Sequence, residues 1–228
     1  MIFKSLAFHI STRYGEEPVT LLRPFRRRIN YLLDSFSLRI PKQTRTELLR
    51  KLNVRVRYER SQRVPFYALE GIGCVEFVDP GIVSIYTATQ SEAVELIKGF
   101  LRRGFQVAAK SDPLFASHLE LWEELLSTAE EEFDFDCRVS RSHPSRRWRC
   151  EAVLRISPAA YHYDVLIKDS KSEQTIHRHR IRSTECVLPL FTGIGFSKLR
   201  WEKEEVVGLT SKDAEVFRFT AFPPSFPC

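Results

Sequence analysis

Two histidines and three arginines alternate in the segment 175–182. A β-strand repeats every two residues, so this segment would place His177 and His179 on one face. Arg178, Arg180 and Arg182 would lie on the other face. An imidazole can act as a general acid or base on an RNA 2′-hydroxyl, and a row of guanidiniums can follow phosphates. We therefore predict His177 and His179 as catalytic residues beside a phosphate-binding strand; the alternative is a solvated edge strand whose charges discourage pairing.

His177 and His179 could instead be two ligands of a metal ion. No cysteine or histidine partner lies at a spacing typical of a metal site, so we predict neither a metal ion nor another cofactor. The chain has 5 cysteines, an odd number, and none forms a C-x-x-C pair. This usage indicates reduced thiols and favours a cytoplasmic protein.

Charge is segregated along the chain. Residues 23–63 hold 13 Lys and Arg against 3 Asp and Glu, and residues 137–201 hold 13 against 5. Between these basic blocks, residues 64–136 hold 4 basic against 14 acidic residues. Solubility does not require such segregation, so it favours a polyanionic partner, RNA or DNA, over two solvated basic faces.

Most of the basic residues are arginines, whose planar forks suit bidentate contacts with phosphate. In the first block they stand close in sequence to Tyr58, Phe66 and Tyr67, a combination that single-stranded nucleic acid needs for charge and stacking. The predicted nucleic-acid contacts are Arg26, Arg27, Arg28, Arg55, Arg57, Arg60, Arg63, Arg146, Arg147, Arg178, Arg180 and Arg182.

The apolar pattern predicts an α+β protein. Residues 1–110 read as strand, helix, strand, strand, helix, strand, the order of a ferredoxin-like βαββαβ domain. In that reading residues 82–87 and 105–109 are strands, and 44–52 is a short helix. Residues 111–134 are expected to form a connector helix that begins at the cap Asp112. Residues 135–228 are expected to be a β-rich domain, and no stretch approaches the roughly 18 apolar residues of a membrane span.

The strand–helix order of residues 1–110, the chain length, the basic balance and the stretch Gly193-Ile194-Gly195-Phe196-Ser197-Lys198 together show a resemblance to a known family. The chain resembles the CRISPR repeat-RNA-processing endoribonucleases of the RAMP superfamily. That resemblance implies ferredoxin-like domains, RNA cleavage without metal and a Gly-rich loop near the C-terminus. The glycines are equally typical of a hairpin turn.

Two functions from different classes follow. The first is a nucleic-acid-binding protein, RNA favoured, that acts as a metal-independent endoribonuclease or retains a structured RNA with other protein subunits of a larger complex. The second is a non-catalytic protein-interaction module, an immunity or assembly factor, that uses the acidic block 64–136. Neither function requires a membrane.

Overall fold

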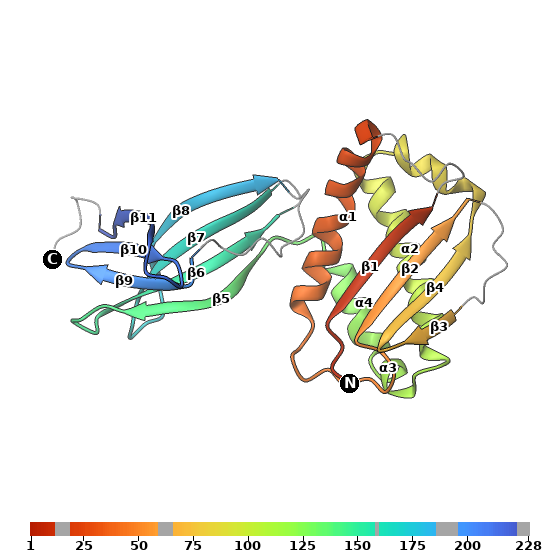
Figure 1. Cartoon of the computed structure of the whole chain (residues 1–228), viewed down its shortest axis with the longest axis horizontal. Coiled ribbons are helices and arrows are strands. Elements are labelled where there is room, and N and C mark those ends of the chain that lie inside the picture. The colour runs from red at the N-terminus through yellow and green to blue at the C-terminus, as the bar shows by residue number, and fades with distance from the viewer. Residues whose placement is uncertain (12–18, 59–65, 158–159, 186–195, 223–228) are drawn as a thin grey trace. The chain divides into compact units, whose positions relative to one another are not determined.

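The computed structural model describes residues 1–11, 19–58, 66–157, 160–185 and 196–222, without the side chains of residues 11, 19–28, 90 and 185. The chain divides into two compact units, Met1–Glu131 (unit 1) and Glu132–Cys228 (unit 2). Unit 1 combines a mixed sheet with helices, and unit 2 consists of antiparallel sheets (Figure 1). The predicted α+β class is therefore confirmed.

The sheet of unit 1 has the strand order β1-β2-β4-β3. β1 pairs with β2 in parallel and β2 pairs with β4 in parallel, whereas β3 is an antiparallel edge strand. Parallel neighbours need a crossover connection, and the long helix α1 supplies it between β1 and β2. The strands are β1 (Ser5–Ser11), β2 (Lys51–Arg57), β3 (Phe66–Leu69) and β4 (Ile72–Val78).

Helices cover one face of this sheet, and in Figure 1 α2 and α4 lie behind the strands. Rings join the two layers, since Phe100 of α2 lies 6.2 Å from Phe8 of β1 and 5.9 Å from Phe77 of β4. Trp122 of α4 is fully buried and stacks on Phe115 with ring centroids 5.1 Å apart. The helices are α1 (Val19–Arg39), the 3₁₀ helix η1 (Pro80–Tyr86), α2 (Gln90–Ala109), α3 (Pro113–Ala116) and α4 (Leu119–Ser127).

The ferredoxin-like order expected for residues 1–110 is not the order in the structure. A split βαβ unit holds a further strand between the two strands that a helix connects. Here β1 and β2, joined by α1, are direct neighbours. Local periodicity predicts which segments are strands or helices, but it does not encode which strands pair. The types of β1, α1 and β2 were therefore predicted correctly, whereas the order of the strands in the sheet was predicted wrongly.

Two of the predicted strands are helical. Residues 105–109 continue α2, because Gly104 does not end the helix but lets it approach the sheet. A β-carbon at Gly104 would lie 2.6 Å from Cγ2 of Val54, so the glycine is required for close packing. Residues 82–87 belong mostly to η1, which starts where Asp79 accepts a hydrogen bond from the Gly81 N–H at 2.8 Å and Pro80 fixes the first turn.

Asp112 has a larger role than the predicted helix cap. Its buried carboxylate accepts hydrogen bonds from the N–H of Phe115 (2.9 Å), Glu47 (3.1 Å) and Leu48 (2.8 Å). The two latter donors hold the segment 44–50 in an irregular conformation, where a helix over 44–52 was expected. The expected connector helix over 111–134 is two shorter helices, α3 and α4, which pack on α2 within unit 1.

Unit 2 is a meander of four strands, β5-β6-β7-β8, packed on a three-stranded sheet, β11-β10-β9. The predicted β-rich half is confirmed, although the first two residues of β5 lie in the range expected for the connector helix. Its core lies between the sheets and includes Val165, Ile167, Val206 and Phe219. The strands are β5 (Phe133–Ser142), β6 (Trp148–Ile156), β7 (Ala160–Asp169), β8 (Thr175–Glu185), β9 (Lys198–Glu202), β10 (Glu205–Leu209) and β11 (Glu215–Thr220).

Within the described residues, no helix has the length and apolar character needed to cross a membrane.

Candidate nucleic-acid interface

The predicted basic residues of unit 1 are described only in part. Arg26, Arg27 and Arg28 lie in α1, but their side chains are outside the described residues, as are Arg60 and Arg63 entirely. Two others alternate with buried valines of β2, as the sequence predicts, and are half-buried: Arg55 and Arg57.

Strand β8 confirms that the histidines and Arg178 face opposite sides, but it does not form one row of three arginines. A register shift separates the pair Asp164–Arg180 from the pair Tyr163–Arg182. The bulge turns Arg182 to the other face, where its guanidinium lies 4.9 Å from the ring centroid of Tyr163. Of the three predicted arginines, Arg178 and Arg180 remain on the outer face of the four-stranded sheet.

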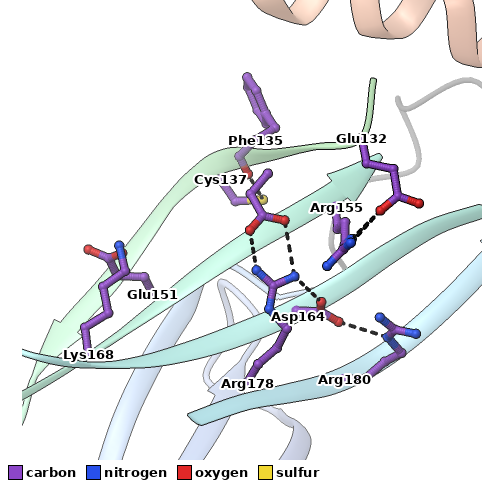
Figure 2. A network of polar contacts seen from close by, with 10 residues as sticks. Glu132, Phe135, Cys137, Glu151, Arg155, Asp164, Lys168, Arg178 and Arg180 are labelled. Carbon is purple, nitrogen blue, oxygen red and sulfur yellow. Dashed lines mark hydrogen bonds and ion pairs between the residues drawn. The ribbon is translucent and has the colours of Figure 1, made fainter. Parts of the chain in front are cut away.

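Both of these guanidiniums already form ion pairs with carboxylates (Figure 2). The fully buried side chain of Asp164 accepts from Arg178 and Arg180, each at 3.2 Å, and Arg178 also pairs with Asp134 of β5. A phosphate at this place would have to displace buried or paired carboxylates. The outer face is therefore an ion-pair network that supports the sheet, and it is a weak candidate for phosphate binding.

The two predicted catalytic histidines lie on the inner side of β8. His179 stacks on Phe219 of β11, with ring centroids 3.9 Å apart and planes 5° apart, and His177 lies 6.3 Å from His179. Burial lowers the pKa of His179, and the neighbouring His177 lowers it further. The role of His179 in the described structure is packing between the sheets, and the catalytic assignment stays a prediction.

The lowered pKa of His179 makes stability depend on pH. The imidazole ordinarily titrates near 6.5, so below this value the unfolded chain binds a proton more readily than the folded chain. The stabilisation is complete above that value and is lost as the pH falls through it. We expect the free energy of unfolding of unit 2 to decrease from about pH 7 to about pH 5.5, and His179→Phe to flatten that decrease. Urea unfolding followed by tryptophan fluorescence at each pH measures this; an unchanged slope in the variant would contradict it.

A basic groove lies elsewhere in unit 2, between the edge strands β5 and β9. It consists of two adjoining hollows of about 470 Å³ and 370 Å³ that share Ser140, Arg141 and Arg200. The charged and hydroxyl side chains of this β5–β9 groove come from both strands and from the turn after β10: Arg138, Ser140, Arg141, Ser142, Ser197, Lys198, Arg200 and Asp213.

A bulge in β5 positions Arg138 at the groove. Asp136 pairs with Val153, and the next paired residue of β5 is Ser140, opposite Glu151, so the bulge spans 137–139. Arg138 adopts a left-handed φ of 57° there, and its N–H donates to Oδ1 of Asp136 at 2.7 Å. A left-handed backbone is unfavourable for a residue with a β-carbon, and such strain concentrates at functional sites.

The groove has an excess of positive charge. Lys198 pairs with Asp213 at 2.9 Å, and Arg200 pairs with Glu202. Arg138 and Arg141 are exposed and make no ion pair with any residue in the described part of the chain. Unlike Arg178 and Arg180 of β8, these two guanidiniums are available to a phosphate without displacing a carboxylate.

Trp201 stabilises the wall of the groove. Its indole N–H donates to the carbonyl of Arg141 at 3.0 Å, and His143 packs edge-on against its ring at 4.8 Å. The two remaining predicted contacts lie in the adjacent β5–β6 turn. Arg146 is exposed at a φ of 58°, and the guanidinium of Arg147 lies 4.4 Å from the ring centroid of Trp148.

The acidic block is used largely within unit 1. Glu95 and Glu130 both pair with the buried Lys98 at 3.2 Å, and Glu123 pairs with Arg102 at 2.7 Å. Glu95 pairs within α2, Glu130 reaches Lys98 from the turn after α4, and Glu123 joins α4 to α2, so these three glutamates are used inside unit 1 and do not form a separate acidic surface.

Within the described ranges, no three or more His, Cys, Asp and Glu side chains gather closely enough to hold a metal ion. Comparisons extend to protein-family models, curated proteins and solved structures. None of them matches this chain.

Proposed function

We propose that the protein binds nucleic acid through its phosphodiester backbone, in the β5–β9 groove. The observation that carries the proposal is the pair of exposed guanidiniums, Arg138 and Arg141, that have no carboxylate partner among the described residues. Lys198 and Arg200 face them from β9, each beside a carboxylate with which it pairs.

The shape and chemistry of the groove support a polyanion as the ligand. Guanidiniums donate two parallel hydrogen bonds to phosphate oxygens, and the serine hydroxyls on both walls add donors of the kind that contact phosphates. The strained backbone at Arg138 is an added cost that the fold tolerates at this site, which is typical of a residue held for binding.

A salt series tests the proposal. Two guanidiniums without carboxylate partners that contact about two phosphates predict a slope of about −1.4 for log affinity against log salt, for single strands. Affinity should then fall about sevenfold between about 50 mM and 200 mM salt. Fluorescence anisotropy with labelled single-stranded RNA and with DNA of the same sequence measures both quantities. Absent binding, or binding that salt does not weaken, would refute the proposal.

The proposed function does not include the cleavage of RNA that the resemblance implies. His177 and His179 lie on the face of β8 opposite Arg178 and Arg180, so these imidazoles and guanidiniums do not share one site. The proposed function is binding, and a catalytic residue is not part of it.

A further inference from the structure

Unit 1 has a second basic surface, on the sheet face opposite the helices. α1 and α2 contact the side of the sheet that carries Phe8, Val54 and Val75. The alternate residues of β1, β2 and β4 point the other way, and among the described residues no helix packs on them. We call this surface the open sheet face, and its described polar side chains are Ser5, His9, Lys51, Asn53, Arg55, Arg57 and Glu76.

The parallel register brings its charges together. His9, Arg55 and Glu76 are direct neighbours across β1, β2 and β4. Glu76 pairs with Arg57 at 2.6 Å, and its side chain is only 7% exposed. Arg55 and Lys51 make no ion pair within the described part of the chain, so the open sheet face has an excess of positive charge.

The pKa of His9 on this face is consistent with the excess of positive charge. Burial lowers the pKa of His9, and the nearby charges of Arg55 and then Lys51 lower it further. The imidazole is thus mostly neutral at physiological pH. In that state it offers both a donor and an acceptor to a ligand. An aromatic ring lies on the adjacent edge strand, where Tyr67 pairs with Cys74 and is 40% exposed.

We propose that the open sheet face is a second contact surface for nucleic-acid phosphates. This inference rests on the proposed function of the β5–β9 groove and extends it. The occupant follows from charge complementarity: two cations without carboxylate partners and a flanking ring suit a backbone with stacked bases. Two linked contacts also make binding depend on ligand length, because the second contact forms intramolecularly.

Lysine footprinting of the intact chain tests the proposal directly. An amine-reactive reagent labels exposed lysines, and mass spectrometry compares their rates with and without a saturating single-stranded RNA about 40 nucleotides long. We expect protection of Lys51 and Lys198 by more than about threefold, and none at the exposed control Lys110 at the end of α2. Protection of Lys198 without Lys51 would overturn the second surface and leave the groove intact. Protection of neither would overturn both, and protection of Lys51 alone would overturn the two-surface arrangement.

Variants and a competing polyanion complete the test. Lys51→Gln combined with Arg55→Gln should weaken binding of the long RNA by about tenfold to a hundredfold and leave a short oligonucleotide of about 6 nucleotides, bound in the groove, unaffected. The control Lys42→Gln with Lys110→Gln removes the same charge from exposed positions of unit 1 and should change neither affinity. Poly-glutamate should not protect Lys51; equal protection by that acidic polypeptide would overturn nucleic acid as the ligand of this face.

Discussion

Replacing Arg138 with glycine should make the protein more stable and at the same time a weaker binder. Glycine adopts a φ of 57° without a steric penalty, so we expect the free energy of unfolding to rise by about 0.5 to 1 kcal/mol. The lost guanidinium should lower affinity for single-stranded RNA about tenfold and reduce the salt slope by about 1. Arg138→Gln keeps the strain and removes the charge, so it should weaken binding equally without stabilising the fold. Combining Arg138→Gln with Arg141→Gln should cost about a hundredfold in affinity.

A matched control separates backbone strain from binding. Lys203 in the β9–β10 turn has the same φ of 57° and the same charge, but it does not line the groove. Lys203→Gly should therefore stabilise the fold by a similar amount and leave affinity and salt slope unchanged. Equal losses of affinity in Lys203→Gly and Arg138→Gly would show that overall charge, and not the groove, governs binding.

Replacing Asp112 with alanine should give a large loss of stability in unit 1. The substitution leaves three backbone N–H groups without their carboxylate acceptor: that of Phe115 is buried, and those of Glu47 and Leu48 are part-buried. Unsatisfied buried donors cost about 1 to 3 kcal/mol each, and partial access of water reduces the sum, so we expect a loss of about 3 to 5 kcal/mol. Helical circular dichroism during urea unfolding reports on unit 1, because every described helix lies there.

Two substitutions calibrate this result. Asp112→Asn keeps the oxygen that serves Glu47 and Phe115 and loses the one that serves Leu48, so its effect should be intermediate. Asp79→Ala removes a cap whose carboxylate accepts one exposed N–H, that of Gly81, and should cost about 1 kcal/mol or less. If Asp112→Ala is no more harmful than Asp79→Ala, then the three-way bonding does not hold the 44–50 segment.

Local pattern predicted much of the fold and little of the site. β6 stands where its apolar pattern predicts a strand, and β2 does so from Val54 onward although its first residues fell in the helix expected over 44–52, because strand period is a property of neighbouring residues. The pairing of β1 with β2 and the packing of Gly104 on Val54 depend on residues far apart in sequence, and no local signal contains them. Residues 133–139 did alternate Phe, Asp, Phe, Asp, Cys, Arg and Val, so β5 was open to prediction and was missed.

The candidate site depends on contacts between residues that lie far apart in the sequence. The basic block 137–201 predicted that unit 2 would have cationic surfaces, but not which arginines would meet carboxylates. Arg178 and Arg180 stood out by spacing, yet they lie beside Asp164. Arg138 and Arg200, which no motif marked, meet across the β5–β9 groove only because two sheets bring their edges together.

The bulge at 137–139 also bears on whether the protein stays dispersed at high concentration. β5 is a ten-residue strand at the margin of its sheet, and a long, straight margin can recruit the same strand of another molecule into a growing aggregate. A bulge interrupts the ladder of backbone hydrogen bonds, and an exposed charge at its centre repels a like strand. The bulge that turns Arg138 toward the groove therefore also disfavours pairing of this edge strand with another molecule. Arg138→Gly, which should stabilise the fold, would remove the repelling charge and with it part of this protection against aggregation.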